Sequence, residues 1–195
     1  QTAANVILEE RACSDYRRAA TTPHASAPAW LRPPLCYACA MRLKIPRSVL
    51  VVIYTPDQQV LLLERTDASG HASGIWQSVT GSLEHEGEAY AKCAAREVME
   101  ETGLNCHAAG HTLTDWHLEN TYDIWPQYLH RYPPGVTRNT ERVFSLQIPQ
   151  PITVALAERE HVNQVWLDWQ AAALRVSSAS NEWAIRRIVG HEIGS

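Results

Sequence analysis

Glutamates are concentrated in residues 81–104, a segment whose pattern predicts a helix closed by Gly103. Glu97 and Glu101 are four residues apart and therefore share one face of that helix, with Glu100 one residue off it. Like charges at this spacing repel each other by roughly a few tenths of a kcal/mol per pair. Such a face is therefore either solvated with help from an arginine, or a site where carboxylate oxygens bind a hard cation such as Mg²⁺ together with substrate phosphates.

The same segment resembles the Nudix box, a family pattern written G-x5-E-x7-R-E-U-x-E-E-x-G-U, in which U is apolar. Glu88 is followed at the required distance by Arg96-Glu97-Val98-Met99-Glu100-Glu101-Thr102-Gly103-Leu104, so every specified position from Glu88 onward is present. The chain departs from the pattern at one point, because six residues separate Gly81 from Glu88 where the pattern has five. We expect the loop before the helix to bulge by one residue near His85-Glu86, while the helix keeps its phase.

This resemblance implies an α/β protein with the Nudix-type α/β/α sandwich on a mixed sheet. It also implies Mg²⁺ or Mn²⁺ as the cofactor and hydrolysis of a nucleoside diphosphate linked to another group. Outside the box, several segments resemble the bacterial dihydroneopterin triphosphate pyrophosphohydrolases, a Nudix group of folate synthesis that releases pyrophosphate and leaves the monophosphate. These segments are residues 76–82, residues 130–141, Glu160-His161, residues 166–168 and Ser180-Asn181.

Carried over residue by residue, the resemblance implies three sets of site residues. The metal ligands are Glu97, Glu101 and Glu160. The catalytic residues are Arg96, Glu100 and Glu101, and either glutamate is a candidate for the base that accepts a proton from the attacking water. The substrate contacts are Lys44, Arg65, Thr80, His161 and Ser178.

Structural roles compete with several of these assignments. Lys44 and Arg65 are equally typical of solvated cations at strand ends, and His161 of an ordinary hydrogen-bonded histidine. Trp76 is either a core residue or a stacking platform for a ring. Arg96 is expected to relieve the repulsion among the glutamates through an i,i+4 contact with Glu100.

Three further interpretations concern residues outside the three sets. Arg131 and Arg138 either clamp phosphates or pair with Glu141. Cys93 and Cys106 are interpreted as packing residues. The last helix is expected to cover the core with Trp183, Ile185, Ile188 and Val189.

Short apolar strands and two helices must position these side chains. A first strand is expected to end at Tyr54 and to pair with a second over residues 60–65 across a turn at 56–59, followed by a loop over 66–75. We predict helices over 88–102 and 181–191, and strands over 112–118, 142–148 and 164–167.

Residues 1–40 differ from the rest of the chain, because they are rich in alanine and proline and show no sustained period. Met41 resembles a natural start, so we interpret residues 1–40 as an N-terminal extension of low order and residues 41–195 as the Nudix hydrolase domain. Cys36 and Cys39 have CxxC spacing, but no partner pair suited to zinc lies near them in the sequence.

Composition limits the partners of the protein. The 195 residues carry 17 Lys+Arg against 21 Asp+Glu, a net charge of −4, which argues against nucleic acid or anionic lipid as a partner held by bulk positive charge. No apolar run is long enough to span a bilayer, and the odd number of cysteines fits reduced thiols in the cytoplasm. The expected partner is a small-molecule triphosphate, and the oligomeric state stays open.

Three functions share these features. The first is a Mg²⁺-dependent pyrophosphohydrolase acting on 7,8-dihydroneopterin triphosphate. The second is a housecleaning Nudix hydrolase of nucleoside triphosphates, which differs only in the pocket for the base. The third is a Nudix-fold module that binds nucleotide without hydrolysis; the intact glutamates Glu97, Glu100 and Glu101 argue against it, and the inserted residue argues weakly for it.

A chain that begins at Met41 is expected to keep its activity and its cooperative unfolding midpoint, because the domain assignment places no core contact in residues 1–40. Thermal unfolding followed by circular dichroism tests this, with the full chain as the reference. A large fall in the midpoint would show that the segment packs on the domain.

Overall fold

The computed structural model describes residues 43–67 and 70–190. The expected extension over residues 1–40, with Cys36 and Cys39, lies outside the described residues, so the domain boundary stays a prediction. Among the described residues, no helix is both long and apolar enough to cross a membrane.

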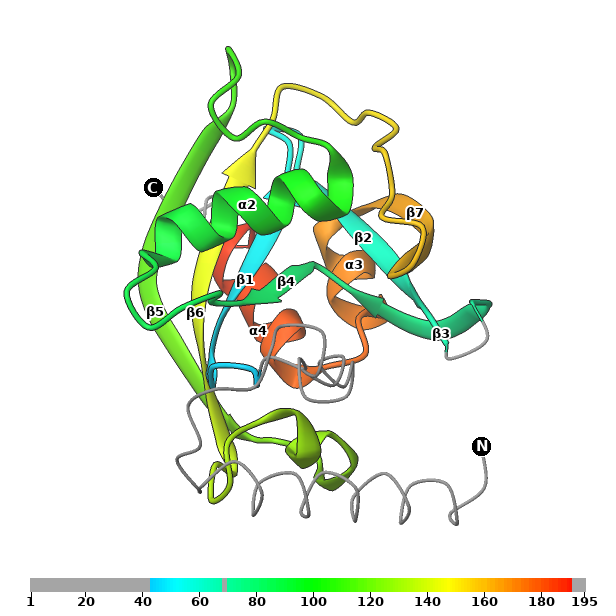
Figure 1. The fold of residues 1–195 in the computed structure, drawn as a ribbon. Helices are drawn as coiled ribbons and strands as arrows, with labels where there is room; N and C mark the ends of the chain where they lie inside the picture. Colours follow the sequence, from blue (N-terminus) through cyan, green and yellow to red (C-terminus); the bar gives the residue numbers. More distant parts are fainter. Residues whose placement is uncertain (1–42, 68–69, 191–195) are drawn as a thin grey trace, which may run out of the picture. The chain divides into compact units, whose positions relative to one another are not determined.

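The described part of the chain is an α/β fold built on a mixed sheet, as predicted (Figure 1). Its strands are β1 (Arg47–Tyr54), β2 (Gln59–Thr66), β3 (Ala72–Gln77), β4 (Val79–Ser82), β5 (Thr112–Asp123), β6 (Arg138–Gln147) and β7 (His161–Asp168). The helices are α2 (Tyr90–Thr102), α3 (Trp169–Arg175) and α4 (Ala179–Ile188), with a 3₁₀ helix, η3, at Pro126–Arg131.

The sheet runs in the order β3-β2-β1-β6-β5, with β4 paired to β1 and β7 paired to β2. Strands β1 and β6 are parallel and pair along the whole of β1, whereas the other pairs are antiparallel. Strands β1 and β2 are paired only at Tyr54 and Val60, next to their hairpin turn. They separate beyond that point, and β3 continues into β4 so that one pairs with β2 and the other with β1.

Two apolar layers cover the two faces of the sheet. On one face, Val49 and Phe144 pack with Cys93 and Val98 of α2, and on the other face Leu50 and Val143 pack with the helices α3 and α4. Alternate residues of β1 therefore serve different layers, which follows from the two-residue period of a strand. Burial of apolar surface on both faces explains the near-continuous apolar run in this strand.

The helix α2 confirms the predicted C-terminal end but begins two residues later than expected. Gly103 adopts the left-handed conformation, with φ 70°, and its N–H donates to the Met99 carbonyl. At the other end, Ala89 is extended and Glu88 is occupied by contacts with the preceding loop, so the first helical residue is Tyr90.

Several elements differ from the sequence-based expectation. The segment expected as a loop over 66–75 contains most of β3, and α3 was not predicted. Strands β5 and β6 are longer than expected, because they pair with each other down to Asp123 and Arg138, with an irregularity between Asp115 and Leu118. Pairing between distant segments, which apolar alternation does not report, decides these bounds.

The last helix only partly confirms its prediction. Ile185, Ile188 and Val189 are fully buried, but Trp183 is 41% exposed, so its assignment to the core was wrong. The reason is the helical period, which turns Trp183 away from the face shared by the other three. Cys93 and Cys106 are buried free thiols, which confirms their packing role.

Asn181→Ala is expected to lower the free energy of unfolding by about 1–3 kcal/mol. Asn181 is buried, and its Oδ1 accepts a hydrogen bond from the N–H of Ser78, at 2.7 Å, where β3 passes into β4. The substitution leaves that buried N–H without an acceptor. Urea unfolding measures the effect, with the exposed Gln170→Ala as control. Equal stability of the two variants would mean that Asn181 does not hold this junction.

Candidate active site

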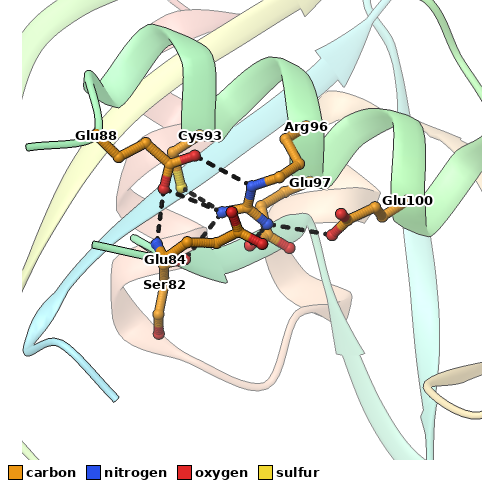
Figure 2. Close-up of polar contacts among 7 residues, drawn as sticks. All are labelled: Ser82, Glu84, Glu88, Cys93, Arg96, Glu97 and Glu100. Carbon is orange, nitrogen blue, oxygen red and sulfur yellow. Dashed lines mark hydrogen bonds and ion pairs between the residues drawn. The ribbon is translucent and has the colours of Figure 1, made fainter. Parts of the chain in front are cut away.

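Arg96 connects the glutamates of α2 to the loop before the helix (Figure 2). Its guanidinium donates to Glu97 at 2.7 Å, to Glu100 at 3.1 Å and to the Ser82 carbonyl at 3.0 Å. It also lies 3.2 Å from a Glu88 oxygen. The predicted contact with Glu100 is confirmed, but it is one of several, which include a contact with Cys93 Sγ at 3.4 Å. The position of Arg96 is that of a residue that orients carboxylates.

Glu88 stabilises the loop that carries the extra residue of the box. Its side chain is buried, and Oε2 accepts a hydrogen bond from the N–H of Glu84 at 2.7 Å. Burial acts to raise the pKa of Glu88, but the bonds from Arg96 and from the Glu84 N–H outweigh it and hold the pKa below its usual value. The chain turns between His85 and Glu88, where the Glu88 N–H donates to the His85 carbonyl at 3.0 Å. This exposed turn lies where the inserted residue was expected, and the helix after it is regular.

Glu97 packs directly on the backbone of Gly81. A Cβ atom at position 81 would lie 1.8 Å from the carboxyl carbon of Glu97, so any other residue here would displace that side chain. Burial raises the pKa of Glu97 to about 7, against the effect of Arg96 and with the repulsion of Glu101 and Glu100. Gly81 lies on the far side of the inserted residue from the helix, and its role is therefore to make room for this carboxylate.

Glu101 lies at the centre of a group formed with the segment that leads into β7, in which Glu101 and His161 are buried and Glu160 is exposed. The loop is tied to the end of α2 by a bond from the Ala155 N–H to the Thr102 carbonyl, which brings Glu160 and His161 to Glu101. Ligand atoms of Glu101, Glu160 and His161 all lie within 4.8 Å of one another. Two of the three predicted metal ligands are therefore together. Glu97 is not in this group, although the charge of Glu101 acts to raise the pKa of Glu97.

The donor set fits a hard cation. His161 Nε2 lies 2.9 Å from Glu101 Oε2, whereas the buried Glu101 Oε1 has no hydrogen-bond partner among the described residues. Burial raises the pKa of Glu101, and the bond with His161 only partly opposes this. Burying a carboxylate oxygen without a hydrogen-bond partner costs free energy unless the oxygen coordinates a cation or carries a proton. The alternative of a hydrogen-bonded histidine is what the structure shows for His161, and its contact with substrate stays a prediction.

Cationic side chains border the carboxylates. Burial lowers the pKa of Lys44, as do the charges of Arg131 and Arg65, whereas Glu97 and Glu160 act in the opposite direction. Lys44 is therefore a partly buried group between acidic and basic neighbours. Arg65 lies opposite His161 across the β2–β7 pair. Adjacent carboxylates and cations can hold a metal and phosphate oxygens at the same time.

Thr80 and Ser178 lie on the other face of the sheet. Thr80 pairs with Leu50, a residue of the apolar layer under α3 and α4, and its hydroxyl accepts from Gln77 at 3.2 Å. Ser178 caps α4 by accepting a hydrogen bond from the Asn181 N–H at 3.3 Å. These two predicted substrate contacts are therefore not assembled with the carboxylates, and their roles stay predictions.

Contacts bear on two of the open alternatives, those for Trp76 and for Arg138, and the binding of phosphate by Arg131 and Arg138 stays a prediction. Trp76 is only 8% exposed and packs in the core, with Arg175 above its ring at 4.8 Å, so the core interpretation holds. Arg138 pairs with Asp123 at 3.2 Å, and the pairing considered for it with Glu141 was wrong. The reason is that Arg138 and Asp123 face each other across β5 and β6.

Comparison with known proteins agrees with this geometry. Residues 44–189 match the NUDIX domain. The chain belongs to the Nudix family. The dihydroneopterin triphosphate diphosphatase of Escherichia coli (strain K12) is 44% identical over 147 residues, which cover 75% of this chain and 93% of that protein. The protein of the same name from Haemophilus influenzae is 33% identical over 148 residues, covering 75% and 89%.

A solved structure gives the same result. The structure of the E. coli dihydroneopterin triphosphate pyrophosphohydrolase matches with a TM-score of 0.67 at 42% identity, covering 75% of this chain and 97% of that one. The resemblance to the Nudix family and the expected Nudix fold are confirmed.

Glu97→Gln and Glu101→Gln are each expected to lower turnover by roughly a hundredfold or more, because a neutral amide is a much weaker ligand for a hard cation than a carboxylate. Steady-state turnover with Mg²⁺ tests this, and circular dichroism shows whether the fold survives. The control is Glu182→Gln on α4, where the carboxylate pairs with Arg186 on the helix surface. Near-normal rates in either variant would remove that glutamate from the mechanism.

Proposed function

We propose that this Nudix protein hydrolyses 7,8-dihydroneopterin triphosphate to the monophosphate and pyrophosphate. The observation that carries the proposal is the buried Glu101 oxygen that has no hydrogen-bond partner in residues 43–67 and 70–190, beside Glu160 and bordered by Lys44 and Arg65. This arrangement suits a metal-bound polyphosphate. The choice of substrate is supported by the names of the relatives from E. coli and H. influenzae, of which this chain covers about nine-tenths.

Glu97, Glu101 and Glu160 would hold Mg²⁺, with Mn²⁺ as an alternative ion. A divalent ion bound there neutralises charge on phosphate oxygens and polarises the phosphorus for attack by water. Glu97 and Glu101 keep their positions through Arg96 and His161, respectively. The group formed by Glu101, Glu160 and His161 supports the assignment of the second and third ligands.

The remaining roles of the protein residues are binding of the substrate and transfer of a proton. Lys44 and Arg65 would bind phosphate oxygens and compensate the charge that develops on the leaving pyrophosphate. Glu100 is the better candidate for the base, since its side chain is 56% exposed and reachable by water, whereas Glu101 is engaged with His161. Arg96 would act by orienting Glu97 and Glu100.

A cytoplasmic location is consistent with the buried free thiols of the domain.

Dihydroneopterin triphosphate is expected to have a kcat/KM at least about tenfold above that of GTP or dGTP, which corresponds to about 1.4 kcal/mol in transition-state binding. The phosphates of these compounds are the same, so the difference must arise at the ring and its side chain. Turnover with product identification tests this, and pyrophosphate is the expected product. Equal efficiency on GTP would favour a housecleaning hydrolase, and release of orthophosphate would place the attack at a different phosphorus.

A further inference from the structure

A group of polar side chains lies under the N-terminal end of α4, on the sheet face opposite α2, and its members Ser48, Asn139 and Glu141 are buried. The Glu141 cluster consists of Ser48, Asn120, Tyr122, Asn139, Glu141 and Ser180. Strand register builds it, because Glu141 of β6 lies opposite Ser48 of β1 and opposite Asn120 of β5. Asn139, two residues earlier on the same face, donates to the hydroxyls of Ser48 at 2.6 Å and Tyr122 at 3.0 Å.

The cluster leaves hydrogen-bonding atoms unused. Glu141 is only 4% exposed and Asn139 only 2%. Within the described residues, Glu141 Oε1, Asn139 Oδ1 and Asn120 Nδ2 are buried and have no hydrogen-bond partner. Buried polar atoms are nearly always paired in folded proteins, and unpaired ones mark a strained position or a missing ligand. Three such atoms in one cluster indicate a ligand.

In the part of the chain that the structure describes, no cationic side chain forms an ion pair with Glu141. Arg138 pairs with Asp123, and Arg142 pairs with Asp115 and Glu119. The groups that act on the Glu141 carboxyl are instead polar and uncharged: Ser180, Asn120 and Tyr122 lie near it and act to lower its pKa, but they do not outweigh the effect of burial. Burial raises the pKa of Glu141 to about 7. A neutral ligand with N–H donors would satisfy this carboxylate without bringing a charge into the core.

The unused atoms match one type of ring edge. Glu141 Oε1 and Asn139 Oδ1 are acceptors, and Asn120 Nδ2 is a donor. A 2-amino-4-oxopyrimidine ring offers an amino group, a neighbouring ring N–H and an adjacent carbonyl oxygen on one edge, and pterins and guanine share this edge. We propose that Glu141 is a specificity-determining residue that accepts the amino and ring N–H groups of this edge, with Asn120 donating to the ring carbonyl. The proposal rests on the proposed function and names the residue that selects the ring.

The position of the cluster relative to the carboxylates of α2 is compatible with one substrate. Ser48 lies opposite Glu141 on one side and opposite Ser82 of β4 on the other. Ser82 directly follows Gly81, on which the carboxylate of Glu97 packs. A ring held at Glu141 and phosphates held near Glu97 are therefore connected through neighbouring residues of β1 and β4.

Binding of the ring without phosphates tests the proposal directly. The probes are 7,8-dihydroneopterin and guanosine, titrated by calorimetry into the metal-free full chain. Glu141→Gln is expected to weaken the binding of both at least about tenfold, because the amide presents a donor to the donors of the ring. The matched control is Glu64→Gln, a buried glutamate whose carboxylate already accepts from the Gly74 N–H and from Asn163. Equal affinity of the wild-type and Glu141→Gln proteins would overturn the proposal.

A second comparison depends on no variant, so it remains decisive if Glu141→Gln does not fold. Inosine is guanosine without the 2-amino group, and the wild-type protein is expected to bind it at least about tenfold more weakly. Equal binding of the two nucleosides would overturn the role of Glu141. Because metal and phosphates are absent from both titrations, failure of the proposed hydrolysis would appear separately, as absence of pyrophosphate release from the triphosphate.

Discussion

The active-site geometry depends on holding several carboxylates close together in a partly buried position, where they repel one another and lose hydration. Arg96 makes this arrangement tolerable by contacting Glu88, Glu97 and Glu100 at once, while His161 contacts Glu101. These contacts do not fully offset the repulsion and the lost hydration. Burial still raises the pKa of Glu97 to about 7, and one oxygen of Glu101 has no hydrogen-bond partner among the described residues. A site organised in this way still attracts a cation, and the contacts of Arg96 and His161 hold the carboxylates in position to bind it.

The separation of β1 from β2 determines which segments border the carboxylates. Because the two strands pair only beside their hairpin turn, β3 and β4 can pass between them and place successive residues on opposite faces. Gly81 meets Glu97 on the α2 side, whereas Thr80 and Ser82 face the side of α3 and α4. One short strand thus borders both the carboxylates and the Glu141 cluster. A substrate with a charged and an aromatic end requires such a pair of adjacent but chemically different environments.

Features that depend on neighbours in the chain could be predicted. The helical period placed Glu97 and Glu101 on one face, set the contact between Arg96 and Glu100, and put a left-handed glycine at position 103. The same reasoning identified the first strand by its apolar run. It failed for β3, in which only Trp76 is buried and which exists because it pairs with β2. It also failed for Trp183, where the apolar character of the side chain was a weaker guide than its direction on the helix.

The sequence by itself therefore determined the acidic helix and the relative phase of its glutamates, because these follow from contacts over three or four residues, and it indicated the family through its resemblance to the Nudix box. Only the tertiary structure decided that Glu160 and His161 lie beside Glu101, some sixty residues away, and that Arg138 pairs with Asp123 instead of Glu141. It alone showed that Gly81 makes room for a carboxylate and that Glu141 has an unused oxygen. The physical reason is that strand pairing and loop paths bring these residues together, and the local pattern of polar and apolar residues does not encode those long-range contacts.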